Sequence, residues 1–246
     1  MSRLIAFGDS FAYGQGLNGV NSPHTHAHSG AWPTKLADTL GLECINQAKP
    51  GASNKLIWYL ATLFDIRPDD VVVFGWSCPQ RHLIFNKYLT DTYSGQLSDL
   101  INYAEPDADF SQIGNWMIDT DPRANAYYTH IYTPEDSWMS TLMQMSHIDL
   151  LIKQVTPYVI HTSIGSQIEF FELSSDSVIA RDGNPVSTNG GNVKPKWFDI
   201  DIVQTFDYEL ASIGELPDGH PDQASHDSFA KRLNHKILSL YPELTP

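Results

Sequence analysis

The sequence predicts an α/β fold in which a mostly parallel sheet is covered by helices on both faces. Short apolar runs alternate along the chain with longer segments that repeat their apolar residues at helical spacing. The run at 71–76 is apolar throughout, as expected of a strand that is buried on both faces. Loops of small and polar residues follow the predicted strands, and doubly wound sheets bind their ligands at these strand ends.

The predicted elements follow in the order β-α-β-α-β, insertion, α-β, loop, α. The strands are expected at 3–8, 43–46, 71–76 and 158–163. The helices are expected from Ala31 to Leu40 and over 53–65, 135–155 and 222–240. The whole chain, 1–246, is expected to form a single domain. Weak periodicity predicts an irregular insertion with one or two short helices at about 79–134, and a long loop region at about 164–217.

Apolar spacing supports each of the helices. Pro33 suits a first helical turn, and Leu36 and Leu40 follow it on one face. The later helices carry similar stripes of apolar residues: Leu56, Ile57, Leu60, Leu63 and Phe64 in one, Trp138, Leu142, Met145, Ile148, Leu151 and Ile152 in the next, and Phe229, Leu233, Ile237 and Leu240 in the last.

Charge and composition exclude several classes of function. The chain has 15 basic and 29 acidic residues, a formal charge of −14, so nucleic acid and anionic membrane surfaces are repelled on average. No apolar run reaches the ~20 residues that cross a bilayer, so no membrane insertion is expected. The sequence favours a neutral or weakly charged small molecule or glycan as the partner and leaves the oligomeric state open.

The cysteines and the N-terminus bear on where the protein works. Cys44 and Cys78 form neither a disulfide framework nor a zinc site. Met1-Ser2-Arg3 runs directly into the first strand without the pattern of a signal peptide. A cytoplasmic protein is expected, and a phage protein released by lysis would have the same features.

Four segments at predicted strand ends or helix starts carry the residues suited to chemistry. Ser10 follows the first strand among glycines, where its hydroxyl can enter a cleft and its N–H can donate. Gly51 precedes a helix, where a backbone N–H can meet an anion. Gly75-Trp76-Ser77 ends the third strand, and Asp218-Gly219-His220-Pro221 precedes the last helix. A nucleophilic serine needs a base such as His220, and that imidazole needs an acceptor such as Asp218.

In this order, the segments resemble the GDSL/SGNH hydrolase family. Gly8-Asp9-Ser10 matches its first block, Gly51 its second, and the Asp and His before the last helix its fifth. The resemblance implies a flavodoxin-like α/β/α sandwich, a carboxylic ester hydrolase that needs no cofactor and no metal. It implies that Ser10 is the nucleophile, His220 the base and Asp218 its orienting acid, with an oxyanion hole formed by the N–H groups of Ser10 and Gly51.

Two positions depart from the family pattern. Ser77 stands where the third block has asparagine, so Ser77 donates to the oxyanion, or Asn54 substitutes for it, or the hole has two donors. The Asp-x-His spacing is one residue shorter than the usual Asp-x-x-His, with Pro217 at the usual acid position. Asp9, Asn54 and Trp76 are further candidates for substrate contacts.

Other polar and aromatic clusters have simpler interpretations. His24, His26 and His28 could share a metal, but they lack acidic or cysteine neighbours, and a polar loop is preferred. Arg81-His82, after Ser77, could contact substrate, but a solvated loop is preferred. The aromatic residues of the insertion fit a sugar-stacking wall and a small satellite core equally well; they are Trp116, Tyr127, Tyr128 and Tyr132.

The preferred function is hydrolysis of a small acyl or acetyl ester, with a carbohydrate as one candidate for the alcohol part. Lysophospholipids, thioesters and aryl esters are alternative substrates in the same fold. A catalytically degenerate domain that binds a glycan or a structural partner is the alternative from a different class of function.

Overall fold

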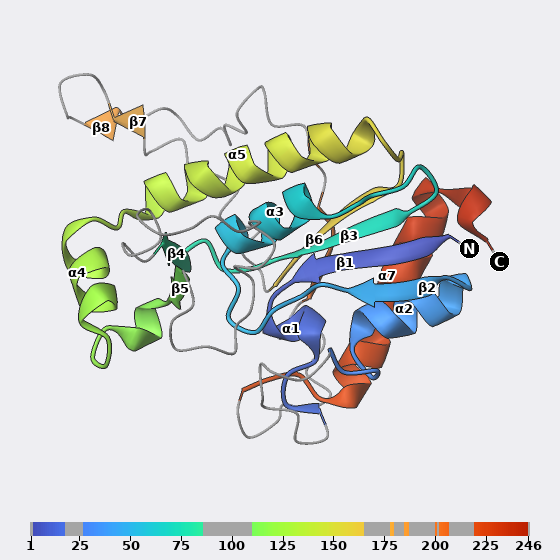
Figure 1. Ribbon diagram of the computed structural model, residues 1–246, viewed down its shortest axis with the longest axis horizontal. Coiled ribbons are helices and arrows are strands. Elements are labelled where there is room, and N and C mark those ends of the chain that lie inside the picture. Colours follow the sequence, from blue (N-terminus) through green and yellow to red (C-terminus); the bar gives the residue numbers. More distant parts are fainter. Residues whose placement is uncertain are drawn as a thin grey trace, which may run out of the picture.

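The computed structural model describes residues 2–17, 27–85, 110–164, 178–179, 185–186, 200, 202–206 and 219–245. In these parts a five-stranded sheet lies between two layers of helices (Figure 1). All neighbouring strands are parallel. Across the sheet the strands are β2 (Glu43–Asn46), β1 (Arg3–Gly8), β3 (Val71–Trp76), β6 (Val159–Ile164) and β9 (Ile202–Phe206). The predicted fold class is therefore confirmed.

The two helical layers cover opposite faces of the sheet because side chains alternate along each strand. Leu4 and Ala6 of β1 join the apolar cluster beneath α2 (Trp32–Leu40) and α7 (Gln223–Leu240). Ile5 and Phe7 join the cluster beneath the other two long helices, α3 (Asn54–Leu63) and α5 (Pro134–Lys153). The predicted strands and long helices agree with the structure to within two residues.

Helix α7 is joined to the start of α2 by a buried hydrogen bond. Ala31 caps α2 without a side-chain hydrogen bond. The backbone N–H of Trp32 instead donates to Nδ1 of His226, 3.2 Å away. Burial lowers the pKa of His226 to about 4, so this ring is neutral at pH 7 and can accept the bond.

A buried ion pair fastens the amino ends of β1 and β3. Nε of Arg3 donates to Oδ1 of Asp70 at 2.8 Å, and the side chains are 9 % and 0 % exposed. The pKa of Arg3 is raised by its hydrogen bond to Asp70. Desolvation raises the pKa of Asp70, but the hydrogen bonds and charges of Arg3 and Arg67 together lower it by more, so that the net pKa is lowered. This pair lies at the end of the sheet opposite to the polar segments singled out above.

The carboxyl end of the sheet carries a group of short elements. They are α1 (Ser10–Tyr13), β4 (His82–Phe85), β5 (Phe110–Ile113), a 3₁₀ helix (Asn115–Met117) and α4 (Pro122–His130). The β4–β5 pair and α4 lie at the end of the molecule opposite to the two termini, whereas α1 lies directly at the end of β1 (Figure 1). The segment predicted as an irregular insertion with one or two short helices also contains the antiparallel β4–β5 pair.

The region 164–217 is also more regular than predicted. β9 adds a fifth strand to the sheet beside β6, and β7 (Val178–Ile179) pairs with β8 (Pro185–Val186). The polar residues Gln204 and Thr205 interrupt the apolar pattern of β9. Because β9 lies at the edge of the sheet, it does not need the continuous apolar run that marks β3. After α7, a 3₁₀ helix (Pro242–Leu244) ends the described chain.

Within the described part of the chain, no helix has the length and apolar character required to cross a membrane. Cys44 and Cys78 are not disulfide-bonded. Burial raises the pKa of Cys44 to about 11.

Candidate active site

Ser10 is the first residue of α1, directly beyond the carboxyl end of β1. Asp9 caps this short helix by accepting a hydrogen bond from the N–H of Phe11 at 3.0 Å, and Gly14 ends it in the left-handed conformation. Ser10 is 4 % exposed. Among the described residues, neither its hydroxyl nor its backbone N–H has a hydrogen-bond partner. Both groups therefore remain able to bond a ligand.

Gly8 makes the sharp turn from β1 into α1 possible. A Cβ atom built on Gly8 would lie 2.6 Å from the Cβ of Ala12 and 3.2 Å from the carbonyl oxygen of Gly75. Any side chain there would push α1 away from the end of the strand. The glycine of the Gly-Asp-Ser motif is thus required by close packing rather than by an unusual φ.

Asp9 forms the centre of a buried polar network. Its Oδ2 accepts from the hydroxyl of Ser77 at 2.9 Å and from Nη1 of Arg81 at 2.7 Å, while its Oδ1 bonds Phe11. Asp9 is 1 % exposed. The protein itself thus surrounds and satisfies the carboxylate, and the substrate contact of Asp9 stays a prediction.

Ser77 and Asn54 lock the end of β3 to the start of α3. The N–H of Ser77 donates to Oδ1 of Asn54 at 2.7 Å, and Nδ2 of Asn54 donates to the carbonyl oxygen of Ser77 at 2.9 Å and to Oγ1 of Thr141 at 3.2 Å. Both donors of Ser77 are thus occupied, one by Asn54 and the other by Asp9. The oxyanion role of Ser77 would require one of these two hydrogen bonds to break, and it stays a prediction. A contact from Asn54 to substrate, or to an oxyanion, would first have to break one of these bonds.

Trp76 belongs to the core rather than to a binding surface. It is 2 % exposed, and its Nε1 donates to Nδ1 of His161 at 2.9 Å. Nε2 of His161 faces Oδ1 of Asp149 on α5 at 3.0 Å. Its ring is nearly parallel to the rings of Phe74 and His161, with centroids 5.2 Å and 6.0 Å away, in the apolar core on one face of the sheet. The substrate contact of Trp76 stays a prediction.

Gly51 lies at the same edge of the sheet as Ser10. The N–H of Lys49 donates to the carbonyl oxygen of Gly8 at 3.0 Å, which brings the loop after β2 beside the end of β1. Gly51 has a φ of 72°, and a Cβ built on it would meet no atom within 4 Å. No hydrogen bond of its N–H is formed with the described residues. The oxyanion role of Gly51 stays a prediction.

His220 lies beside the first turn of α1. Its ring is 5.7 Å from the ring of Phe11, measured between centroids, and Phe11 directly follows Ser10. The two stretches from opposite ends of the chain therefore meet. No hydrogen bond joins the Ser10 hydroxyl to the His220 imidazole in the described structure. Such bonds are often long before substrate binds, so the base role of His220 stays a prediction. Asp218 lies outside the described residues.

Arg81 is more buried at this edge than the sequence predicted. A solvated loop was preferred to a substrate contact, yet its side chain is 13 % exposed and forms an ion pair with Asp9. Its guanidinium also lies under the ring of Trp116, with Cζ 5.2 Å from the ring centroid. The distance of 72 residues between Arg81 and Asp9 leaves no local pattern that could have revealed the pair.

The histidine-rich segment is described only in part. His24 and His26 lie outside the described residues, and Nδ1 of His28 accepts from the N–H of Gly30 at 2.9 Å. The described residues contain no group of three or more His, Cys, Asp or Glu that could hold a metal ion.

Comparison with known proteins places the chain among distant structural neighbours. No family model matches the sequence, and no curated protein matches it. A carbohydrate esterase of family two from Clostridium thermocellum, solved with cellohexaose, superposes with a TM-score of 0.48 at 14 % identity over 98 % of this chain and 65 % of that one. A family two enzyme of Corynascus thermopiles (Myceliophthora fergusii) gives 0.47 at 14 % identity, over 97 % and 66 %.

A protein described as a putative lipolytic G-D-S-L protein, from Desulfitobacterium hafniense, gives a TM-score of 0.41 at 8 % identity over 96 % of this chain and 99 % of that one. The chain thus spans about two thirds of the length of the two carbohydrate esterases and nearly the whole of the lipolytic protein. The solved structures to which the chain is similar thus include a protein described as belonging to the G-D-S-L family, the family that its motifs resemble.

Proposed function

We propose that the chain is a serine ester hydrolase of the SGNH type that cleaves a small acyl or acetyl ester. The proposal rests on the position of Ser10 and on the hydrogen-bonding groups that it leaves available. Ser10 stands at the end of a parallel strand, with a hydroxyl and an N–H that no described residue bonds, and with His220 packed beside the same turn. Ligand sites of doubly wound sheets lie at this edge.

The proposed reaction has two steps. Oγ of Ser10 attacks the ester carbonyl carbon while His220 takes the hydroxyl proton. The tetrahedral intermediate then collapses, and the alcohol leaves with the proton from His220, so that the acyl group stays on Ser10. Water, deprotonated by His220, attacks this acyl-serine, and the carboxylic acid is released with Ser10 restored.

Asp218 is the proposed partner of the far nitrogen of His220. It would fix the tautomer of the ring and stabilise the imidazolium that forms in each step. The N–H groups of Ser10 and Gly51 would hold the negative charge that develops on the carbonyl oxygen. Because both donors of Ser77 are occupied, the proposed hole has two backbone donors, and one missing donor typically costs ~3 kcal/mol of transition-state stabilisation.

Hydrolysis of p-nitrophenyl acetate tests the proposal. Wild-type protein is expected to release p-nitrophenol and to be labelled by a fluorophosphonate, whereas Ser10→Ala is expected to lose both. Ser163→Ala provides a matched control, because Ser163 is a buried serine at the end of another strand of the same sheet. Turnover that persists in Ser10→Ala would overturn the assignment of the nucleophile.

A binding domain without hydrolysis is the second candidate. The occupied donors of Ser77 favour it, because they remove the third oxyanion donor that the family resemblance implies. Absence of both turnover and fluorophosphonate labelling in the folded wild-type protein would support this candidate over the esterase. A lysophospholipid or thioester substrate would instead give turnover of those esters that exceeds turnover of the acetyl ester.

A further inference from the structure

Arg81 joins the two loops whose backbone N–H groups are proposed to hold the oxyanion. Its Nη1 donates to Oδ2 of Asp9 at 2.7 Å and to the carbonyl oxygen of Ala52 at 3.4 Å. Asp9 directly precedes Ser10 in the chain. Ala52 directly follows Gly51. One guanidinium group therefore contacts a chain neighbour of each proposed oxyanion donor.

The carboxylate of Asp9 would oppose the proposed reaction if it had no counter-charge. Asp9 is 1 % exposed, and the N–H proposed to hold the oxyanion belongs to the next residue, Ser10. The tetrahedral intermediate places a second negative charge at this N–H, and buried like charges repel strongly because water and salt screen them little. In the described structure Asp9 accepts hydrogen bonds from the N–H of Phe11, the hydroxyl of Ser77 and the guanidinium of Arg81. Of these three donors, only the guanidinium carries a charge.

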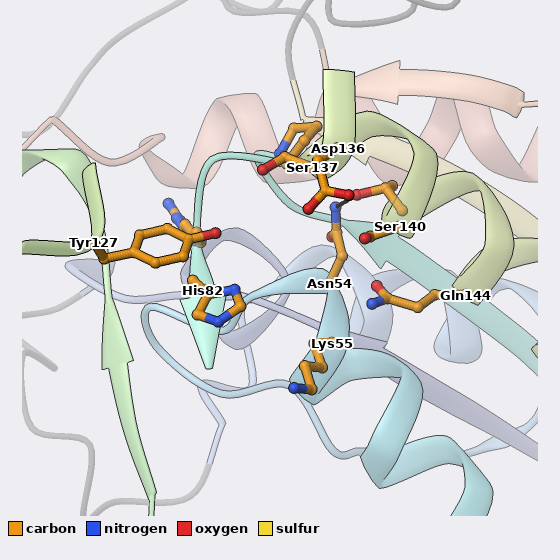
Figure 2. A pocket seen from close by; sticks show the side chains of 11 residues that line it. Asn54, Lys55, His82, Tyr127, Asp136, Ser137, Ser140 and Gln144 are labelled. Atoms are coloured by element: carbon orange, nitrogen blue, oxygen red, sulfur yellow. Dashed lines mark hydrogen bonds between the residues drawn. The ribbon is translucent and has the colours of Figure 1, made fainter. Parts of the chain in front are cut away.

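The surroundings of Arg81 keep its charge beside Asp9. The side chain of Arg81 is 13 % exposed, and its Cζ lies 5.2 Å from the centroid of the Trp116 ring. Arg81 also lines a pocket of about 220 Å³ where the starts of α3 and α5 meet β4 and α4, whereas Asp9 is not part of this lining. Figure 2 shows Tyr127 on one side of the pocket and Gln144 on the other. Solvent in the pocket therefore contacts Arg81 and not the carboxylate, which leaves the guanidinium to compensate the charge of Asp9.

We propose that Arg81 is a positioning residue for ester hydrolysis, acting through Asp9 and through the loop of Gly51. It neutralises the carboxylate of Asp9, so that the negative charge of the intermediate develops without a bare carboxylate beside it. It also ties the loop of Gly51 to the turn of Ser10, which fixes the two N–H groups relative to one another. This inference rests on the proposed function, because it concerns the oxyanion of that reaction.

Steady-state hydrolysis of p-nitrophenyl acetate by variants of Arg81 tests the inference. Arg81→Gln removes the positive charge and is expected to lower kcat by about tenfold to a hundredfold, less than the ~100–1,000-fold typical of a lost oxyanion donor, because Arg81 acts through another residue. The ester is uncharged and the oxyanion forms in both steps, so KM is expected to stay within about twofold of the wild-type value.

The double variant Asp9→Asn/Arg81→Gln separates charge compensation from the loss of a contact. The carboxylate is replaced by a neutral amide, whose oxygen can still accept from the N–H of Phe11. No buried negative charge then remains to repel the oxyanion. The double variant is therefore expected to have a higher kcat than Arg81→Gln alone, although it carries one more substitution.

Arg3→Gln is the matched control, because Arg3 and Asp70 form a buried ion pair at the opposite end of the sheet. This variant is expected to have a lower Tm, as Arg81→Gln does, and to keep the wild-type kcat. All rates are measured at a temperature where thermal unfolding shows each variant to be folded, so that a loss of fold is not mistaken for a loss of catalysis.

Four results would overturn the inference and leave the proposed function standing. They are a wild-type kcat in Arg81→Gln, a rise of KM in place of a fall of kcat, a double variant no faster than Arg81→Gln, and an equal fall of kcat in Arg3→Gln. A folded wild type that neither hydrolyses p-nitrophenyl acetate nor reacts with a fluorophosphonate would overturn the proposed function, and this inference with it.

Discussion

At the scale of single residues, Asp9 organises the carboxyl end of the sheet. Its carboxylate accepts hydrogen bonds from the N–H of Phe11, the hydroxyl of Ser77 and the guanidinium of Arg81. One buried charge therefore connects the first turn of α1 with the end of β3 and with the loop that follows it. Removing one partner of a buried pair costs more than the pair contributes, because the other charge stays behind without compensation.

Arg81→Ala is therefore expected to lower the free energy of unfolding by about 3 kcal/mol, measured by urea denaturation at pH 7. Arg123→Ala is the matched control. Arg123 pairs with Asp121, but its side chain is 51 % exposed, and an exposed pair is worth less than about 1 kcal/mol. Equal losses in the two variants would contradict the role given to the Asp9–Arg81 pair.

Gly8→Ala is expected to destabilise the protein by about 1–3 kcal/mol, because the new methyl group would overlap Cβ of Ala12. Gly75→Ala tests whether a neighbouring glycine tolerates the same change. A Cβ built on Gly75 would have its nearest contact at 3.4 Å, from the ring of Trp32. This distance is the short end of ordinary van der Waals contact, so the methyl group is expected to fit. Thermal unfolding of the two variants compares them, and a larger loss at Gly75 would contradict this account of the turn.

At the scale of elements, buried histidines that act as neutral acceptors join one pair of helices and one pair of strands. His226 of α7 accepts the first N–H of α2, and His161 of β6 accepts from Trp76 of β3. Burial lowers the pKa of both rings. A protonated ring has no acceptor nitrogen, so both junctions require the neutral form.

The stability of the protein is therefore expected to fall as the pH falls. The unfolded chain binds a proton at His226 near pH 6.5, whereas the folded chain binds it only near pH 4, so the stabilisation is present above pH 6.5 and is lost below it. Between pH 7.5 and 5.0, His226 alone contributes a loss of about 2 kcal/mol.

Urea denaturation of wild type and of His226→Asn at these two pH values checks this expectation. The asparagine amide can still accept from the N–H of Trp32 but does not titrate. The variant should lose about 2 kcal/mol less than wild type over this range. The same pH dependence in both proteins would rule out His226 as its source.

The sequence allowed most elements to be predicted, because they depend on periodicity that each segment carries in itself. β1, β2 and β3 have the predicted bounds, and α3, α5 and α7 lie within two residues of them. β9 was missed since its apolar pattern is broken by Gln204 and Thr205, and its strand character depends on pairing with β6. Leu151 was assigned to the inner face of α5, yet it is 39 % exposed.

The candidate site was predicted less completely than the fold. Motif order pointed to Ser10, Gly51 and His220, and the structure places Ser10 and Gly51 at one sheet edge, with His220 beside the turn that follows Ser10. The roles of Ser77 and Asp9 could not be predicted, because they depend on hydrogen bonds between segments that are far apart in the chain. The same is true of Arg81.

At the scale of the whole molecule, the two ends of the sheet differ in what their buried ion pairs do. Arg3 and Asp70 close the amino end, and Arg81 and Asp9 close the end that carries Ser10. Breaking either pair would leave a buried charge without its partner, but only the second pair contacts the turn at Ser10. Stability and the proposed catalysis can therefore be perturbed separately.

Asp70→Asn is expected to lower the free energy of unfolding by about 3 kcal/mol, because Arg3 would remain buried without its counter-charge. At a temperature where the variant is folded, its rate of p-nitrophenyl acetate hydrolysis should equal that of wild type. Unfolding curves and initial rates measured on the same samples check both parts. A fall in the rate of hydrolysis without a fall in the free energy of unfolding would contradict the claim that the Arg3–Asp70 pair affects stability alone.

The contrast between the two thiols has a practical consequence. Cys44 is held protonated at neutral pH by its buried surroundings, whereas Cys78 directly follows Ser77 at the edge that carries Ser10. A maleimide dye applied at pH 7 should attach to Cys78 in preference to Cys44. A change in the fluorescence of this dye would then report, in real time, the binding of a ligand at this edge of the sheet, without a chromogenic substrate.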